Sequence, residues 1–158
     1  MPTLVKDLRI ERLDESNWRR ALDVRPRPDQ LEFVADYEPV VLVILSKCDR
    51  RPGGLTWEPF GILVGDKIIG VCALAHAAAG SKLFHFLIDR SCQNRGYGRA
   101  AMKAIIDHLR RERPSCRELT LTVHPRNAPA QRLYGSLGFR DTGELRGGDH
   151  VWKLALGD

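Results

Sequence analysis

The stretch that decides the fold is FHFLIDRSCQNRGYGRAA, residues 84–101. It opens with an apolar segment typical of a β-strand, residues 84–89, and leads through residues 93–98 (QNRGYG) into an amphipathic helix. Gly96 and Gly98 lack Cβ atoms, so the backbone there can turn sharply and approach a ligand closely. The first amides of a helix have no partners within the helix and carry partial positive charge. The order of strand, glycine-rich turn and helix therefore predicts a site for a phosphate or pyrophosphate group.

Other interpretations of these glycines stay open or are excluded by the flanking residues. A GxG pair alone is equally typical of a tight turn that simply leads into a helix. Residues 96–101 also match the dinucleotide fingerprint G-x-G-x-x-A, which requires an acidic residue at the end of the next strand, where this chain has Val123-His124. That fingerprint belongs to a parallel sheet, whereas this loop follows a predicted antiparallel meander. A P-loop is excluded because no Gly-Lys-Ser/Thr follows the glycines.

Before the loop, the sequence predicts helices and a small antiparallel sheet. Residues 8–12 alternate apolar and polar side chains, which indicates a strand, and residues 60–64 and 67–74 flank the turn pair Gly65-Asp66, which indicates a hairpin. A third strand is predicted at residues 82–89. Helices are predicted from Asp14 or Ser16 to about residue 23 and from residue 29 to about residue 37, and residues 38–47 fit either a strand or a buried helix.

After the loop, the pattern changes to alternating helices and strands. The helix that follows the glycines ends before Pro114, a strand is predicted at residues 119–123, and Asn127 and Pro129 open a further helix that Gly138 ends. Residues 139–145 and 150–156 form a closing pair of strands. The apolar faces of the two helices are Ala101, Met102, Ile105, Ile106 and Leu109, and Ala130, Leu133, Tyr134 and Leu137. The expected fold is a mixed α/β (α+β) domain of residues 1–158 with about four helices.

Composition narrows the class of protein. Hydrophobic residues make up 43% and charged residues 28% of the chain, as in a globular domain. The chain has no apolar run of the roughly 20 residues that span a bilayer and no apolar signal core in residues 1–20, so we expect no membrane partner. The four cysteines contain no CxxC pair, which argues against a zinc site and a disulfide framework and favours a reducing cytoplasm. We therefore expect no bound metal.

The basic charge suits either a polyanionic cofactor or nucleic acid. The net charge is +5 and the pI about 9.3. The cations are scattered, however, and the one cluster, Arg110, Arg111 and Arg113, falls at a predicted helix end, where cations complement the helix dipole. We therefore expect no nucleic-acid partner.

Two segments together resemble a known family. Residues 93–98 are similar to the Q/R-x-x-G-x-G/A signature of the GNAT family of N-acetyltransferases, and residues 127–139, NAPAQRLYGSLGF, are similar to that family's N-x-x-A-x-x-L-Y-x-x-x-G-F segment. One helix and one strand separate the two motifs, as in the family. The resemblance covers about residues 8–156. It implies a mostly antiparallel sheet that splays between its fourth and fifth strands, with acetyl-CoA in the cleft.

A narrower resemblance concerns the acceptor. Residues 17–19, 24–30 and 33–35 resemble bacterial spermine/spermidine acetyltransferases, which implies a small amine, such as the polyamine spermidine, as the partner of acetyl-CoA. The polyamine branch often carries an acidic Glu-Pro-Glu-Asn-like segment, whereas this chain has His124-Pro125-Arg126-Asn127. The departure replaces acidic positions by basic or neutral ones. Acidic residues that could face a polyamine are Glu11, Glu15, Asp29, Glu32, Asp36 and Glu38, unless they only form solvated helix faces.

The family resemblance also assigns roles to individual residues. The backbone of Phe86, Leu87 and Ile88 is expected to pair with the pantetheine arm and to hold the thioester carbonyl. Tyr134 is expected to donate a proton to the departing thiolate, and His124 or His85 to take one from the amine. A lone histidine is more often structural, and a tyrosine on an apolar helix stripe is normally a core residue, although its place in the family motif favours the functional role for Tyr134. The remaining residues expected at the cofactor are Gln93, Asn94, Arg95, Gly96, Tyr97, Gly98, Arg99, Asn127 and Ala130.

Two alternatives for the function remain at this point. The acceptor amine could be a protein N-terminus or a lysine in place of a polyamine. The chain could be a non-catalytic acyl-CoA-binding module of the same fold, although a binding module has no need of the proton donor Tyr134. The family resemblance also implies a homodimer, without indicating its surface.

Overall fold

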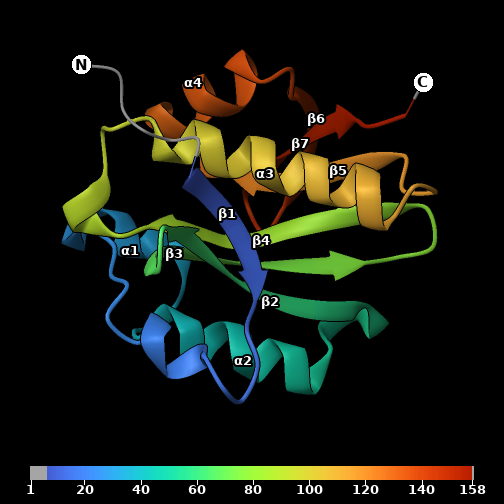
Figure 1. The fold of residues 1–158 in the computed structure, drawn as a ribbon. Helices are drawn as coiled ribbons and strands as arrows, with labels where there is room; N and C mark the ends of the chain where they lie inside the picture. Colours follow the sequence, from blue (N-terminus) through green and yellow to red (C-terminus); the bar gives the residue numbers. More distant parts are fainter. Residues whose placement is uncertain (1–6, 158) are drawn as a thin grey trace.

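The computed structural model describes residues 7–157 and shows a central seven-stranded sheet with helices on both faces (Figure 1). The strands are β1 (Leu8–Arg12), β2 (Thr56–Val64), β3 (Lys67–His76), β4 (Gly80–Ile88), β5 (Glu118–Val123), β6 (Arg140–Arg146) and β7 (Asp149–Ala155). They lie in the order β1-β2-β3-β4-β5-β7-β6. All neighbours are antiparallel except β4 and β5, which are parallel. The expected mixed α/β fold is confirmed.

Helices cover both faces of the sheet. Figure 1 shows α2 (Val40–Arg50) on one face and α3 (Tyr97–Glu112) with α4 (Ala128–Ser136) on the other. The short helix α1 (Leu31–Val34) lies beside β4. Strand β3 is apolar from residue 68 to residue 75 because both of its faces are covered: Cys72 and Leu74 pack under α3, whereas Val71 and Ala73 pack against α2.

The front of the chain corrects several expectations. The ambiguous segment 38–47 is helical from Val40 onward, because Val40, Val41 and Ile44 recur at helical spacing and are buried. The helix expected to run to about residue 23 is only a short 3₁₀ turn, Trp18–Ala21. The helix expected at residues 29–37 is a 3₁₀ turn, Pro28–Gln30, followed by α1, and it ends at Val34 because Ala35 is extended. A further 3₁₀ turn, Pro52–Gly54, precedes β2.

The sheet splays between β4 and β5, as the resemblance implied. The two strands pair only at Gly80, Ser81 and Lys82, although β4 continues to Ile88. Strand β5 pairs instead with β7 along its whole length. The backbone of β4 beyond Lys82 is therefore not paired with β5, and a cleft opens between the two strands.

A bulge bends β4 at the mouth of this cleft. Ala73 pairs with Phe84 and Val71 pairs with Leu87, so His85 and Phe86 together face the single residue Cys72. His85 has a φ of 56°, which is uncommon for a residue with a side chain. The bulge turns the backbone and side chains of this segment toward the cleft.

Candidate active site

Two cavities occupy the cleft and meet in its middle. The inner cavity, of about 240 Å³, lies between α1, β4 and β5, and the loop cavity, of about 220 Å³, runs along β4 toward the start of α3. Both are lined by Phe33, Val34, Phe86, Asn127, Ala130 and Tyr134. The shared lining joins them into one channel, with an aliphatic part beside Leu87 and Ile88 and a charged part beyond Phe86.

The glycine-rich loop presents free helix amides at one end of this channel. A 3₁₀ turn, Arg90–Cys92, follows β4, and helix α3 begins at Tyr97. Gly96 precedes it with a φ of 83°, a left-handed conformation that favours glycine, and no side chain caps the helix. The first amides of a sixteen-residue helix thus remain available to an anion, with Asn94 and Gly98 lining the loop cavity.

Two side chains expected at the cofactor are held by the protein itself. The Gln93 side chain donates to the side-chain oxygen Oε1 of Gln30 at 2.8 Å and to the Ile88 backbone oxygen at 3.0 Å, so it fixes the loop to β4 and to the turn before α1. The Arg99 guanidinium donates to the Ser136 hydroxyl on α4. Gln93 lines the loop cavity, whereas Arg95, Tyr97 and Arg99 lie outside its lining in the described chain.

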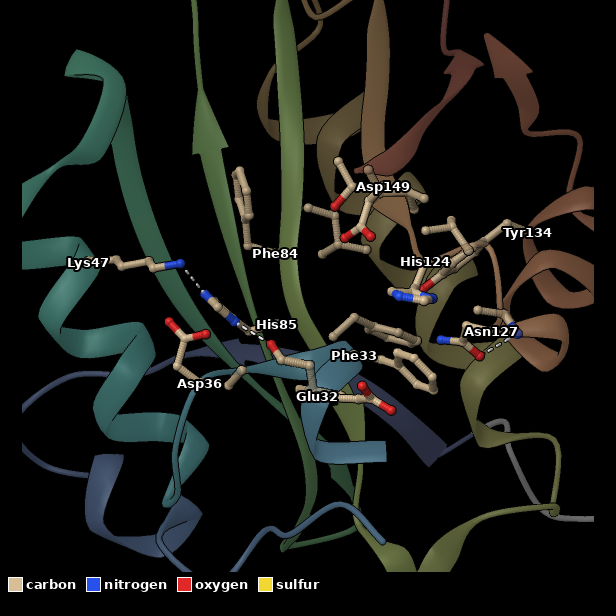
Figure 2. Close-up of a pocket in the computed structure, with 18 residues that line it drawn as sticks. Glu32, Phe33, Asp36, Lys47, Phe84, His85, His124, Asn127, Tyr134 and Asp149 are labelled. Atoms are coloured by element: carbon tan, nitrogen blue, oxygen red, sulfur yellow. Dashed lines mark hydrogen bonds between the residues drawn. The ribbon is translucent and has the colours of Figure 1, made fainter. Parts of the chain in front are cut away.

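Tyr134 lies at the junction of the two cavities. Its ring packs against Phe139 in the core on the α3 face, with ring centroids 5.6 Å apart. Its hydroxyl points toward His124 and the inner cavity (Figure 2). Burial, reinforced by the nearby Cys72, raises the pKa of the phenol far above its ordinary value. The hydroxyl therefore stays protonated and is available as a donor.

The segment between β5 and α4 places His124 and Asn127 on the same wall. The Asn127 side chain accepts a hydrogen bond from the Ala130 amide at 3.3 Å, which confirms the expected helix cap. His124 Nδ1 accepts a hydrogen bond from the Arg126 amide at 3.0 Å. A neutral His124 therefore carries its proton on Nε2, and its ring lies 5.0 Å from the ring of Phe33.

His85, at the bulge of β4, is clamped between two partners. Its Nδ1 lies 2.6 Å from the Val34 backbone oxygen, and because a carbonyl only accepts, Nδ1 is the donor. Burial lowers the pKa of His85 to about 4, so the ring is neutral at pH 7 and Nε2 has a lone pair. That lone pair accepts a hydrogen bond from Lys47 Nζ at 2.8 Å. His85 faces the inner cavity in this arrangement (Figure 2).

The carboxylates of the inner cavity come from both ends of the chain. Of the six acidic residues expected at this wall, Glu32 and Asp36 line the cavity and the other four do not. Glu32 also forms an ion pair with Arg126 at 3.2 Å. Asp149, the first residue of β7, lines the cavity as well and has no ion-pair partner among residues 7–157.

Sequence reasoning missed two charged residues of the inner cavity. Asp149 follows a glycine pair and lies 51 residues after Gly98, and only the pairing of β5 with β7 brings it to the cleft. The sequence contained a weak indication that Lys47 faces the protein interior: it lies three residues after Ile44 and seven after Val40, on the buried stripe of α2.

No helix in the described part of the chain is long and apolar enough to cross a membrane.

The comparisons with known proteins agree with this geometry. Residues 10–139 match the model of the acetyltransferase (GNAT) family. The probable spermine N(1)-acetyltransferase of Bacillus subtilis subsp. natto and the spermine/spermidine N(1)-acetyltransferase of Bacillus subtilis are each 31% identical to this chain over 144 residues, covering 87% of it and 91% of the relative.

A solved structure shows the same fold at lower identity. The spermidine N-acetyltransferase from Vibrio cholerae, in complex with CoA and spermine, superposes with a TM-score of 0.71 at 17% identity, covering 96% of each chain. The splayed sheet, the glycine-rich loop before α3 and the match over residues 10–139 lead to one conclusion. The chain belongs to the GNAT family and is an N-acetyltransferase.

Proposed function

We propose that the protein transfers an acetyl group from acetyl-CoA to a primary amine, and that its first acceptor class is the polyamines. The observation that carries the proposal is the single channel that joins the uncapped start of α3, the unpaired edge of β4 and Tyr134. The pyrophosphate, the pantetheine arm and the thioester of acetyl-CoA would lie along such a channel in that order. A binding module would have no use for a phenol at the junction.

The residues of the channel fit acetyl-CoA, which supplies the thioester. Backbone amides at Gln93 to Arg99 would hold the pyrophosphate, with Gly96 giving the turn its left-handed conformation. The backbone of Phe86, Leu87 and Ile88 would pair with the pantetheine arm as an added strand, and an amide at the bulge would donate to the thioester carbonyl as its oxygen gains charge. Asn127 and Ala130 would contact the arm from α4.

Tyr134 is proposed to act on the leaving sulfur. The nitrogen of the amine forms a bond to the acetyl carbon, the carbon–sulfur bond breaks, and the proton that the nitrogen loses must end on the thiolate. Because the pKa of Tyr134 is raised, a tyrosinate is costly. We therefore infer that two proton transfers occur together: Tyr134 donates its proton to the sulfur, and the phenol oxygen takes a proton from the reacting nitrogen. No free tyrosinate then forms.

The amine must first lose a proton, since an alkyl ammonium has a pKa near 10.4. The deficit at pH 7 is about 3.4 units, or about 4.6 kcal/mol. His124, through water, and His85 are the proposed bases. In the free protein, the Arg126 amide donates to Nδ1 of His124, and Lys47 donates to Nε2 of His85. Each histidine can therefore accept a proton from the substrate only after its own hydrogen bond breaks.

The polyamine acceptor is supported by the two relatives at 31% identity and by the carboxylates at the inner cavity. Glu32 and Asp149, which line the cavity on the side of His124, can each hold an ammonium. A protein N-terminus or a lysine side chain remains the second candidate acceptor. It is favoured by the replacement of acidic residues in the His124–Asn127 segment and by Arg126, which pairs with the cavity carboxylate Glu32.

Release of the CoA thiol from acetyl-CoA tests the proposal. The panel contains spermidine, spermine, aminoglycosides, amino acids and peptides with free N-termini. We expect the largest kcat/KM with a polyamine and the appearance of an acetylated product by mass spectrometry. If only peptides caused thiol release, the acceptor would be a protein and not a polyamine. If acetyl-CoA bound but no amine caused thiol release, the chain would be a binding module.

A further inference from the structure

Lys47 places a positive charge in the wall of the inner cavity. It lies at the end of the buried stripe of α2, so its aliphatic stem runs along the core and its ammonium emerges beside β4 (Figure 2). Trp57 and Phe84 stack on each other with centroids 4.6 Å apart, and Lys47 Nζ is 5.8 Å from the centre of each ring. These contacts hold the ammonium in place.

The hydrogen bond to His85 fixes the orientation of that charge. The Val34 oxygen forces the His85 proton onto Nδ1, so Nε2 accepts one N–H of Lys47. Within residues 7–157, no other hydrogen-bond acceptor contacts Nζ, so its other N–H bonds are left for a group in the cavity. Burial lowers the pKa of Lys47, the charge of Asp36 opposes this effect, and Arg50 adds to it. Among residues 7–157, Asp36 forms no ion pair with Lys47.

The opposite wall of the cavity has the opposite charge. Asp149 and Glu32 line it from β7 and α1, on the side of His124 and Tyr134, whereas Lys47 lies across the cavity beside Phe84, with Asp36 on the same side (Figure 2). The wall with Asp149 thus carries two carboxylates, whereas the wall with Lys47 carries an ammonium and one carboxylate. An ammonium near Asp149 gains attraction, whereas an ammonium near Lys47 meets a like charge in a partly desolvated site.

From this arrangement we propose that Lys47 is a specificity-determining residue that excludes an ammonium from the wall beside Phe84 and accepts there a neutral or anionic part of the acceptor. This inference rests on the proposed function and deepens it. A polyamine would enter with its reacting nitrogen at the junction and its remaining ammonium groups toward Asp149 and Glu32. An amine whose far end carries a carboxylate would bind with that end on Lys47.

Acceptors of matched length test this assignment. Three series are compared at each chain length: α,ω-diamines, n-alkylamines and ω-amino acids, for example cadaverine, pentylamine and δ-aminovalerate. Each is assayed by thiol release, and the ratio of kcat/KM for the diamine to that for the amino acid is the readout. For the protein with Lys47, we expect this ratio to be lowest at the chain length whose far end reaches the ammonium.

Substitutions at Lys47 separate its charge from its structural contacts. Lys47→Gln keeps a donor for His85 but removes the charge, and we expect it to raise the diamine-to-amino-acid ratio by about tenfold or more. Lys47→Arg keeps the charge and should retain the original order. Arg50→Gln, on the same helix but exposed and bonded to Ser46, removes the same charge outside the cavity and should leave the ratio unchanged.

The outcomes distinguish this inference from the proposed function. A Lys47→Gln ratio within twofold of the original at every chain length, in a variant that melts like the parent, overturns the role of Lys47. An absence of thiol release with every amine overturns the proposed function instead. In that case calorimetric binding of cadaverine and δ-aminovalerate to the CoA-loaded protein still decides the role: equal changes in affinity for both on Lys47→Gln would reject it.

Discussion

Gln30 and Gln93 exchange two side-chain hydrogen bonds, at 2.8 and 3.1 Å, although 63 residues separate them in the sequence. The pair joins the turn before α1, which forms one wall of the channel, to the loop that precedes α3. Because Gln93 also donates to the Ile88 backbone oxygen, its side chain connects the loop, β4 and the N-terminal wall. The glutamine that begins the loop motif is therefore a positioning residue in the free protein.

Loss of this pair is expected to loosen the loop. Gln93→Ala should raise the KM for acetyl-CoA several-fold with a smaller effect on kcat, because a hydrogen bond contributes about 1 kcal/mol net and Gln93 makes more than one. Gln30→Ala should raise the KM for acetyl-CoA by a smaller factor, because it removes only the hydrogen bonds between Gln30 and Gln93. In the double variant the two changes should not add, and full additivity would show that the two side chains act independently.

The phenol of Tyr134 is expected to matter for turnover and little for cofactor affinity. Tyr134→Phe keeps the packing against Phe139 and removes only the hydroxyl, so kcat should fall at least tenfold by the usual magnitude of acid catalysis while the Kd for acetyl-CoA stays within about twofold. Tyr37→Phe is the control, since Tyr37 is half exposed. An unchanged kcat in Tyr134→Phe would remove this residue as the proton donor.

Gly96 and Gly143 form a matched pair for the loop assignment. Their φ values are 83° and 78°, and a Cβ at either would meet no protein atom within 4 Å. Gly96→Val and Gly143→Val should therefore destabilise the fold to a similar extent through backbone strain. Only Gly96→Val should weaken acetyl-CoA binding, by blocking the approach of the pyrophosphate. Equal affinity in the two variants, measured by calorimetry, would contradict a cofactor site at this loop.

His85 is expected to make stability depend on pH in the acid range. Its pKa is about 4 in the folded protein and near 6.5 when unfolded, so between these values the unfolded chain binds the extra proton. The free energy of unfolding should therefore fall as the pH is lowered from about 6.5 to about 4, by up to roughly 3 kcal/mol from this residue. His85→Gln should flatten that part of the urea-unfolding profile.

The control for the histidine is His150→Gln. His150 lies on β7 with Nδ1 2.9 Å from the Asp141 carboxylate, away from His85, so the part of the slope that belongs to His85 should remain in this variant. If His85→Gln and the parent lose stability in parallel across this range, the histidine is not held neutral by its surroundings.

Asp149 is expected to bind the acceptor and not the cofactor. Asp149→Asn should raise the KM for a polyamine about tenfold, because a carboxylate facing an ammonium in a partly buried cavity is worth about 1–3 kcal/mol, while the KM for acetyl-CoA remains unchanged. Glu144→Gln on the neighbouring strand, whose carboxylate pairs with Arg146 in solvent, is the control. An unchanged amine KM in Asp149→Asn would remove this residue from the acceptor site.

The parts of the molecule that the sequence predicted well are those set by neighbours along the chain. The turn at Gly96, the helix after it and the cap at Asn127 follow from which backbone angles glycine allows and which side chains bond to nearby amides. The hairpin around Gly65 and the apolar face of α3 follow from the same local rules. Residues 38–47 lay at the limit of this reasoning, because β-branched residues at helical spacing suit both a strand and a buried helix.

Tertiary structure alone decided what faces the inner cavity. The bulge that turns His85, the lysine that occupies its lone pair, and the carboxylate of Asp149 depend on strand register and on packing between distant segments. No local pattern encodes such contacts, since they form only when the sheet splays after Lys82 and leaves a gap for the side chains to fill. The sequence thus determined the fold and the glycine-rich turn before α3, whereas the charged side chains of the inner cavity were brought together by long-range packing.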